Sequence, residues 1–358
     1  MKHEEATLLT GNPRVCLSPA LRDLVETSIS LLPTEEAVRR SWVASAPPVV
    51  SVVCTTYNHE AFIADAFAGF LVQDTSFPFE IIVADDSSSD ATLAVLAAFK
   101  EAYPTIIRIL AGEPERLGYK RNGFRAFAAA RGRYIAFCEG DDYWRDPHKL
   151  QTQVDFLEQN PDYVLTYHNS LGTDASGAQT QDSVLSPEDQ RDWSAEDLIC
   201  YTAIHLPTAT LCFRHVSIDF PPEWRDLVIF PFLSLLGHHG KAKYQGQIAP
   251  SVYRRHSGGV WSALAIEQKR LAELDCLYMM FVYYRRLSQH RYASRLRREF
   301  ISLALGISTT HTARRPHASR AIRVVTVIEK AVCASLLSIE EMFFRIMGEL
   351  RWRRSRAA

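Results

Sequence analysis

The sequence lacks the motifs of several common classes of protein. Its seven cysteines are widely spaced over 358 residues and include no CxxC pair, which excludes a disulfide framework and a thiolate zinc site. There is no GxxxxGK[ST] and no GxGxxG, so a P-loop or dinucleotide-binding fold is disfavoured. No run of about 18 apolar residues could span a membrane, and the N-terminus has no apolar core of signal-peptide length. These absences predict a cytoplasmic protein.

An excess of charge of one sign is also missing from the chain as a whole. Its 40 Lys and Arg residues are balanced by 41 Asp and Glu, giving a net charge of −1, whereas a dedicated nucleic-acid binder would be markedly basic. The balance is uneven, however, because the segment from Arg285 to Ala358 has 16 basic and 5 acidic residues. An acidic body is therefore followed by a basic C-terminal segment.

The first half of the chain alternates short apolar runs with helical patterns. Residues 17–46 predict one or two short helices, and Pro47-Pro48 ends them. Beyond this point the β-branched run 49–54 is typical of a strand buried on both faces. Further strands are expected at 79–84, 106–110 and 134–138, and helices at 61–73, 90–103 (with Asp90 as N-cap) and 122–131. This alternation predicts a parallel α/β sheet with right-handed crossovers.

The pattern is less regular after Asp142. A helix is expected at 146–160 and a strand at 163–167, whereas residues 172–195, rich in Ser, Asp, Gln and Gly, predict an exposed loop. A helix near 232–237 and a strand near 248–253 follow. From Ala263 onward the sequence is almost wholly helical in pattern.

Three polar clusters directly follow apolar strands, where ligands bind in open α/β sheets. They are Thr55–Asn58, Asp85–Asp90 and Glu139–Trp144. The third has three carboxylates within four residues and no Lys or Arg between them, which costs stability unless a cation binds there. Oxygen ligands suit Mg²⁺ or Mn²⁺ bridging to a phosphate. The alternative is a solvated acidic turn that begins the next helix at Asp146-Pro147.

The order of four motifs resembles family 2 glycosyltransferases. The motifs are VSVVCTTYN, IIVADDSSSD, RGRYIAFCEGDDYW and YRRHSGGVWS, and the resemblance spans about residues 48–262. It implies an α/β GT-A fold, a mixed sheet flanked by helices, with a helical C-terminal extension. The expected organisation is a helical extension at 1–46, a GT-A domain at 47–262 and a basic helical region at 263–358. Within the domain, residues 47–145 would bind the nucleotide and 146–262 the acceptor.

The same resemblance implies roles for individual residues. Tyr57 would lie near the nucleotide base, and Asp86 would accept a hydrogen bond from it, which suits uracil. Lys120 or Arg121 would approach the base or the diphosphate. The other expected nucleotide-binding residues are Thr55, Asn58 and Gly140.

The segment Glu139-Gly140-Asp141 stands where the family has its DxD motif. The expected ligands of Mn²⁺ or Mg²⁺ are Glu139, Asp141 and His256, and Asp141 is the strongest of them because the longer glutamate replaces the first aspartate. His256, in the YRRH motif, would close the site and reach the metal or the diphosphate.

The position of the catalytic base departs from the family pattern, because Ile229 occupies the place of the expected aspartate. Either Asp226 or Glu223 reaches the site from a shifted loop, or catalysis is impaired, or the alignment at this point is wrong. On the acceptor side we expect Asp142, Trp144 and Trp261. The tryptophans could stack on sugar rings, although packing in a core or an interface is at least as good an explanation.

The resemblance implies a metal-dependent inverting glycosyltransferase. It would move a sugar from a nucleotide donor, UDP being favoured, to a glycan or lipid-linked acceptor in bacterial surface polysaccharide or glycoconjugate assembly. The alternative is an inactive GT-A module that binds a nucleotide sugar or glycan. The arginine-rich C-terminal region is expected to lie on the inner face of the cytoplasmic membrane or to pack on the catalytic domain or in a homodimer.

Overall fold

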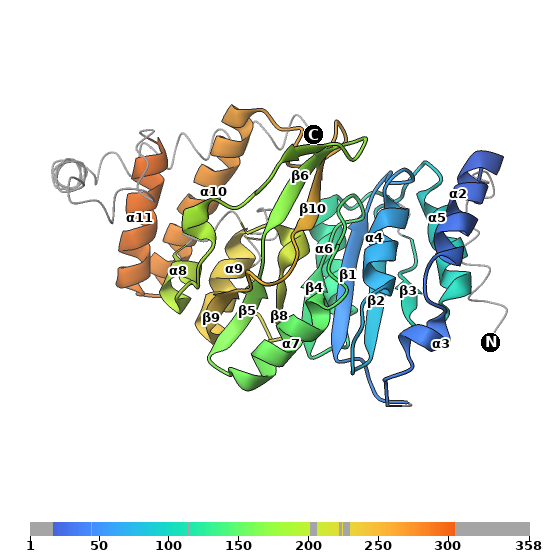
Figure 1. Cartoon of the computed structure of the whole chain (residues 1–358). Helices are drawn as coiled ribbons and strands as arrows, with labels where there is room; N and C mark the ends of the chain where they lie inside the picture. The colour runs from blue at the N-terminus through green and yellow to red at the C-terminus, as the bar shows by residue number, and fades with distance from the viewer. Residues whose placement is uncertain are drawn as a thin grey trace. The chain divides into compact units, whose positions relative to one another are not determined.

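The computed structural model describes residues 17–43, 45–112, 115–200, 206–221, 224 and 230–304. The chain divides into two compact units, Met1–Met279 and Met280–Ala358, and Figure 1 shows their elements in chain order. The first unit contains both sheets. The long helix α10 (Ile266–Arg286) extends across the division, and α11 (His290–Ala304) is the last element described.

The main sheet of the first unit has seven strands in the order β3-β2-β1-β4-β8-β5-β9. Strands β3, β2, β1 and β4 are parallel, as the alternating pattern predicts, whereas β8 runs antiparallel to both β4 and β5. The sheet is therefore mixed. The strands are β1 (Val50–Thr56), β2 (Phe79–Asp85), β3 (Ile107–Ile109), β4 (Tyr134–Phe137), β5 (Tyr163–Tyr167), β8 (Cys212–Arg214) and β9 (Lys241–Tyr244).

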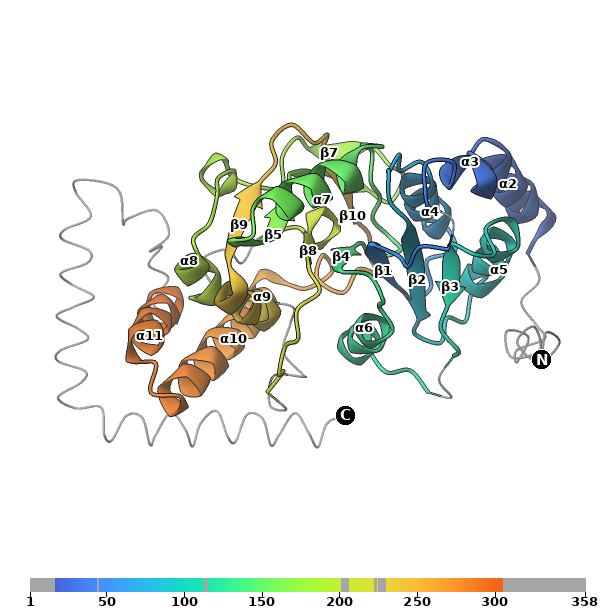
Figure 2. The ribbon, with the colours of Figure 1, turned by 90° about the horizontal axis from the view of Figure 1, so that it is seen from below.

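Helices cover both faces of this sheet, which is why its central strands are apolar on both sides (Figure 2). Val52 packs in one core with the helices α4, α5 and α7, and its neighbour Val53 packs in a second core with α6, α8 and α9. Successive side chains of a strand point to opposite faces, so the run 49–54 supplies both cores. The helices are α4 (Ile63–Leu71), α5 (Thr92–Ala102), α6 (Tyr119–Ala128), α7 (Lys149–Gln159), α8 (Ala195–Ile199) and α9 (Phe230–Leu236).

The expected N-terminal helices are present as α2 (Pro19–Ser30) and α3 (Glu35–Val38). Ser18 caps α2 by accepting a hydrogen bond from the backbone N–H of Leu21, as expected for a serine before Pro19. Hydrogen bonds join this segment to the turn between α5 and β3: the Tyr103 hydroxyl donates to the carbonyl of Pro33, and the Glu35 carboxylate accepts from the backbone N–H of Thr105. The N-terminal extension is thus part of the first compact unit.

The segment 172–195 is not the exposed loop that its composition predicts. It contains the end of β6 (Ser170–Asp174) and all of β7 (Gln179–Gln181), which form a second sheet with β10 (Ser251–Arg255) in the order β10-β6-β7. Leu185 and Trp193 are buried, and Trp193 forms a β-bridge with Ala242. Leu185 and Trp193 are too far apart in a polar segment to form a helical or strand pattern. Both nevertheless pack in the core and hold the segment there.

Two other details differ from the sequence-based expectation. Asp90 is not the N-cap of α5; the N-cap is Ala91, which makes no side-chain hydrogen bond. The Asp90 carboxylate instead accepts hydrogen bonds from the backbone N–H groups of Thr92 and Glu60. The strand expected at 248–253 begins only at Ser251. Beyond Ala263 the helical expectation is confirmed as far as Ala304, and the remaining C-terminal residues lie outside the described part. None of the described helices is long and apolar enough to cross a membrane.

Candidate active site

The three polar clusters meet at one edge of the main sheet. Strands β2, β1 and β4 are parallel neighbours, so their carboxyl ends lie side by side. The segments are joined directly: Asp86 donates its backbone N–H to the carbonyl of Thr56, and Gly140 donates to that of Thr55, each at 2.9 Å. The structure therefore brings the three clusters together at one edge, and their role as a ligand site stays a prediction.

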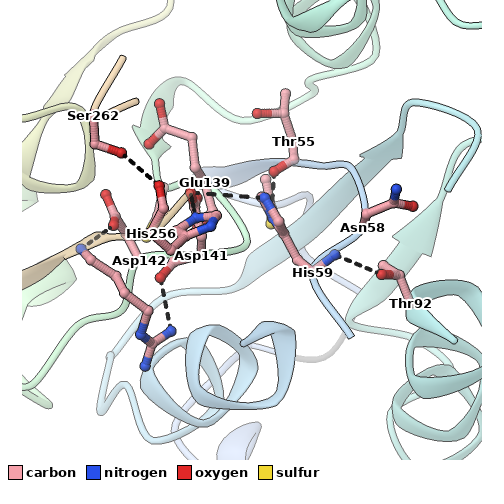
Figure 3. A network of polar contacts seen from close by, with 12 residues as sticks. Thr55, Asn58, His59, Thr92, Glu139, Asp141, Asp142, His256 and Ser262 are labelled. Atoms are coloured by element: carbon pink, nitrogen blue, oxygen red, sulfur yellow. Dashed lines mark hydrogen bonds and ion pairs between the residues drawn. The ribbon is translucent and has the colours of Figure 1, made fainter. Parts of the chain in front are cut away.

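Two histidines and one aspartate form a possible metal-binding group at this edge (Figure 3). The Oδ2 atom of Asp141 lies 2.9 Å from Nε2 of His256 and 3.8 Å from Nε2 of His59. One ligand atom from each residue lies within 4.8 Å of the other two. All three side chains are largely shielded, with exposures of 12% for His59, 17% for Asp141 and 9% for His256.

The second sheet brings His256 to Asp141 across 115 residues of sequence. Tyr143 and Val252 form an antiparallel β-bridge, which fixes β10 beside the acidic segment. Arg254 strengthens this junction: its backbone N–H donates to the Asp142 carboxylate, and its Nη1 donates to the carbonyl of Asp141 at 2.8 Å. Its Nη2 also pairs with Asp65 at 2.7 Å. Arg254 therefore fixes the backbone that carries Asp141.

His59 is held by the loop after β1. Asn58 has a positive φ of 54°, a conformation that asparagine tolerates better than most residues. Its side-chain oxygen accepts from the backbone N–H of Ser89, and the backbone N–H of His59 donates to Thr92 at 2.8 Å. Asn58 thus links the β1 and β2 loops, and its predicted nucleotide contact stays a prediction.

Gly140 provides room for the His59 ring. A Cβ at this position would lie 2.6 Å from Cδ1 of Ile63, 2.9 Å from Oγ1 of Thr56 and 3.1 Å from Nδ1 of His59. The first two separations are shorter than real side chains allow. A larger residue here would have to shift the side chains of Ile63 and Thr56 and crowd the His59 ring, which gives Gly140 a structural role beside its predicted nucleotide contact.

The electrostatic environment favours an ionised aspartate beside neutral imidazole. Burial alone would raise the pKa of Asp141, but the hydrogen bond with His256 and the charges of His59 and His256 hold it below its ordinary value. Burial lowers the pKa of His59 and outweighs the opposing effect of Asp141. A carboxylate and a neutral imidazole are the forms that coordinate metals.

The other two acidic residues of the cluster face different partners. Glu139 accepts a hydrogen bond from the Thr208 hydroxyl at 2.7 Å, and burial, followed by the charge of Asp141, raises its pKa to about 7. It is not in the group formed by His59, Asp141 and His256, so this geometry does not support its predicted role as a ligand. Asp142 is 3% exposed, and its Oδ1 accepts the backbone N–H of Arg254; the structure thus gives it a structural contact rather than an open acceptor surface.

The predicted base-binding residues Tyr57 and Asp86 are joined by Arg116. The guanidinium carbon of Arg116 lies 3.6 Å from the centroid of the Tyr57 ring, and its Nε lies 3.2 Å from Oδ2 of Asp86. The same carboxylate accepts the backbone N–H groups of Leu117 and Gly118 at 2.7 and 3.0 Å. A carboxylate has about four acceptor positions, so these three contacts leave one position on Oδ1 unused.

The remaining predicted residues have varied surroundings. Thr55 is buried at the end of β1, and Lys120 and Arg121 lie in the first turn of α6, where Arg121 is exposed. Trp144 is 2% exposed, packs against Phe70 and donates to the carbonyl of Ala209. Of the two explanations for Trp144, the structure favours core packing. Trp261 is partly buried, with the Lys269 amine 6.0 Å from its ring. Asp226, Glu223 and Ile229 lie outside the described residues.

The donor set of the site fits a divalent cation. Two imidazole nitrogens and one carboxylate oxygen are ligands that Mn²⁺ and related ions accept, whereas Mg²⁺ prefers oxygen alone. The three donors come from two loops and one strand end that hydrogen bonds hold in place. A cation bound by these donors would lie at the same edge of the sheet as Tyr57 and Asp86.

Sequence reasoning did not single out four residues of this site. They are His59, Arg116, Thr208 and Arg254. His59 directly follows the first polar cluster and Arg254 lies inside the YRRH motif, so both carried a positional signal. Arg116 and Thr208 lie in irregular segments with no motif, and only the tertiary structure brings them to Asp86 and Glu139.

Comparison with known proteins finds similarity to glycosyltransferases in the part of the chain that carries Asp141 and His59. Residues 51–209 match the model of glycosyl transferase family 2. An uncharacterised protein of Mycobacterium tuberculosis is 33% identical over 232 residues, which are 63% of this chain and 64% of the relative. The Escherichia coli UDP-Glc:alpha-D-GlcNAc-diphosphoundecaprenol beta-1,3-glucosyltransferase WfaP is 36% identical over 110 residues, which are 31% of this chain and 41% of that protein.

Among solved structures, Staphylococcus aureus TarS 1–349 in complex with UDP-GlcNAc has a similar fold. The TM-score is 0.55 at 18% sequence identity, over 75% of this chain and 77% of TarS. The mixed sheet flanked by helices is the GT-A fold that the resemblance implied, and the family match covers residues 51–209, a little under half of the chain. The match spans just under two thirds of the length of the mycobacterial relative.

Proposed function

We propose that this chain is an inverting glycosyltransferase that moves a sugar from UDP to a hydroxyl group of a glycan or lipid-linked acceptor. The observation that carries this proposal is the convergence of Asp141, His256 and His59 at the carboxyl edge of the sheet, the edge that also carries Tyr57 and Asp86, in a chain with a family 2 match. In the transfer, the acceptor oxygen bonds to the anomeric carbon, the bond from that carbon to the diphosphate oxygen breaks, and UDP leaves. The acceptor proton passes to a base.

Uracil is the base that Tyr57 and Asp86 suit. Tyr57 has an aromatic face, which Arg116 covers in this structure, and the acceptor position that remains on Asp86 matches the single N–H of the uracil ring in UDP. The TarS structure holds UDP-GlcNAc, and the name of WfaP specifies UDP-Glc. Both support UDP as the donor nucleotide for this chain.

Negative charge develops on the diphosphate as its bond to the anomeric carbon breaks. A divalent cation held by Asp141 and His256 would neutralise this charge. The chain itself keeps Asp141 ionised, through the His256 hydrogen bond, and fixes its backbone through Arg254. The role of Arg254 is therefore to position Asp141 rather than to touch the donor.

The acceptor proton needs a carboxylate within hydrogen-bond distance. Asp226 is our first candidate and Glu223 the second, since both precede the place of Ile229. If neither reaches the acceptor, the chain is an inactive module that binds nucleotide sugar. Ile229 is the observation that favours this second function, because isoleucine cannot accept a proton.

The acceptor class is proposed from the family relatives. The name of WfaP specifies a diphosphoundecaprenol-linked acceptor, a lipid that lies in a membrane. The net positive charge after Arg285 would attract anionic lipid headgroups. We therefore propose a role in bacterial polysaccharide or glycoconjugate assembly at the inner face of the cytoplasmic membrane. A homodimer through the C-terminal helices is the alternative use of this region.

UDP binding with and without Mn²⁺ tests the proposal directly. We expect Mn²⁺ to tighten UDP binding by at least about tenfold, since a cation held by Asp141 and His256 would neutralise charge on the diphosphate. Asp141→Asn should abolish this enhancement, and a panel of UDP-sugars should show UDP release for at least one donor. UDP binding that is independent of Mn²⁺ would contradict the metal-dependent reaction, whereas binding without release from any donor would favour the inactive module.

A further inference from the structure

His59 joins the metal-binding group from a loop that the family motifs do not mark as a ligand position. We propose that His59 is a third protein ligand of the cation and that it sets the preference of the site for Mn²⁺ over Mg²⁺. The inference rests on the proposed function, because it assumes a cation bound beside the donor diphosphate.

The distances allow one ion to contact all three side chains. Nε2 of His256 and Nε2 of His59 lie 2.9 and 3.8 Å from the same oxygen of Asp141, and the three ligand atoms lie within 4.8 Å of one another. Two atoms that bind one ion at about 2.1 Å lie at most about 4.2 Å apart. A closure of less than about 1 Å therefore brings His59 into the coordination shell.

Besides its approach to Asp141, the His59 ring makes aromatic contacts with Phe62 and His256. Its Nδ1 atom is buried and has no hydrogen-bond partner in the described part of the chain, and the same holds for Oγ1 of Thr56. Both atoms lie within 3.1 Å of the point that a Cβ on Gly140 would occupy. A ligand histidine commonly donates from its second nitrogen, and the Thr56 hydroxyl borders the same space.

The backbone holds His59 in this position before any ion binds. Its N–H donates to Oγ1 of Thr92, and the next residue, Glu60, exchanges hydrogen bonds with the start of α5: it donates to Asp90 and accepts from Ala91. The ring also packs edge-on to that of His256, with centroids 5.9 Å apart. A rigid, preformed ligand loses little conformational entropy on metal binding.

The donor atoms of the group formed by His59, Asp141 and His256 predict a preference for Mn²⁺ over Mg²⁺. Glu139, the carboxylate at the first position of the DxD-like motif, faces Thr208, so imidazole nitrogens outnumber carboxylate oxygens in the group. Imidazole binds transition-metal ions well, whereas Mg²⁺ retains oxygen ligands and water. A site with two imidazoles therefore discriminates against Mg²⁺ more strongly than a site with one.

Metal binding to the full chain in the presence of UDP provides the test, with Mn²⁺ followed by electron paramagnetic resonance and Mg²⁺ by competition. We expect His59→Asn to weaken Mn²⁺ binding by at least about tenfold and Mg²⁺ binding by less than about threefold. His59→Glu should restore binding and shift the preference toward Mg²⁺. The control is His148→Asn, because His148 is an exposed histidine that follows the acidic segment Glu139–Trp144 in the sequence. This variant should leave the affinities for Mn²⁺ and Mg²⁺ unchanged.

The nitrogen couplings of bound Mn²⁺ give a second measurement that does not depend on affinity. Pulsed electron paramagnetic resonance should detect two imidazole ligands in the wild type and one in His59→Asn, with equal thermal unfolding of the two proteins as the check on folding. Unchanged Mn²⁺ affinity and couplings in His59→Asn, with binding lost in Asp141→Asn, would overturn the role of His59 alone. Absence of Mn²⁺ binding to the wild type would overturn the proposed metal dependence as well.

Discussion

The guanidinium group of Arg116 lies on the face of the Tyr57 ring, 3.6 Å from its centroid. Its Nε atom at the same time lies 3.2 Å from the Asp86 carboxylate. Arg116 thus contacts the aromatic face and the acceptor that we assign to uracil. A nucleobase that stacks on this face of Tyr57 must first displace the guanidinium. The contact between Arg116 and Tyr57 is then lost.

Replacement of Arg116 by alanine should therefore strengthen the binding of the base itself. A cation–π contact at a partly exposed site contributes about 0.5–1 kcal/mol, which corresponds to roughly a two- to fivefold gain in affinity. Uridine, which has no phosphate, isolates this effect in a calorimetric titration of Arg116→Ala. The control is Arg133→Ala, which removes an exposed arginine paired with Glu158. Weaker uridine binding to Arg116→Ala would show that the arginine holds the base instead.

Asp86→Asn should lower both stability and nucleotide affinity. The Asp86 carboxylate accepts two backbone N–H groups, from Leu117 and Gly118, and an amide would turn a donor toward one of them. Loss of a hydrogen bond to a charged group costs about 1.5–3 kcal/mol. Urea unfolding should show this loss, and UDP binding should weaken. Asp74→Asn, at an exposed residue 3.9 Å from Arg40, should change neither; an Asp86→Asn protein of unchanged stability would refute the prediction.

Arg254→Lys should disturb the metal site without changing a ligand. The buried guanidinium donates to the Asp141 carbonyl and to Asp65, and a lysine can replace only one of these contacts because its charge is a single compact group. We expect the Mn²⁺-dependent part of UDP binding to weaken by about tenfold, with metal-free UDP binding unchanged. Arg255→Lys, at the exposed neighbouring residue bound to Gln181, is the matched control. Equal loss of metal-free and Mn²⁺-dependent binding in Arg254→Lys would indicate general damage instead.

The lowered pKa of the buried Lys149 side chain should make the stability of the protein depend on pH. Lys149 is fully buried, donates to Gln153 at 2.7 Å, and burial lowers its pKa to about 8. Between this value and the ordinary lysine pKa of about 10.4, the unfolded chain binds more protons than the folded protein. The contribution of Lys149 to the free energy of unfolding therefore rises with pH across this window.

The comparison of wild type with Lys149→Met isolates that contribution. Below about pH 8 the wild type bears the full cost of the buried charge, so the variant should be relatively more stable at pH 7 by up to about 3 kcal/mol. This advantage should shrink toward pH 10. Burial raises the pKa of the neighbouring Cys138 and Cys212, and both are present in the two proteins. Urea unfolding at pH 7, 8, 9 and 10 measures the difference, and a constant difference would contradict the assigned pKa.

The sequence predicted the fold of the first half of the chain because its signal is local. The residues of β1 are apolar at every position except Ser51 and the final threonines, and such a run fits a strand covered on both faces. The polar clusters after β1, β2 and β4 had to meet, since the strands are parallel neighbours. Asp141 and His256 were identified by the motifs around them.

The segment 172–195 shows where local signals were insufficient. Its strands β6 and β7 are short and polar, and they are stable only because β10 pairs with β6 in parallel from about eighty residues further along the chain. Leu185 and Trp193 fill a core made by other elements. The amino-acid composition of the segment indicates neither the pairing of β6 with β10 nor the burial of Leu185 and Trp193.

The sequence by itself predicted at which edge of the sheet the candidate site lies, because the ends of the strands follow from local periodicity. Only the tertiary structure decided which side chains face one another there. His59 meets Asp141 because the β1 and β2 loops are hydrogen-bonded together, and Glu139 is turned to Thr208 instead. His256 meets Asp141 across 115 residues because the bridge from Tyr143 to Val252 aligns the two segments. The direction of a side chain depends on such long-range contacts, and no local pattern encodes them.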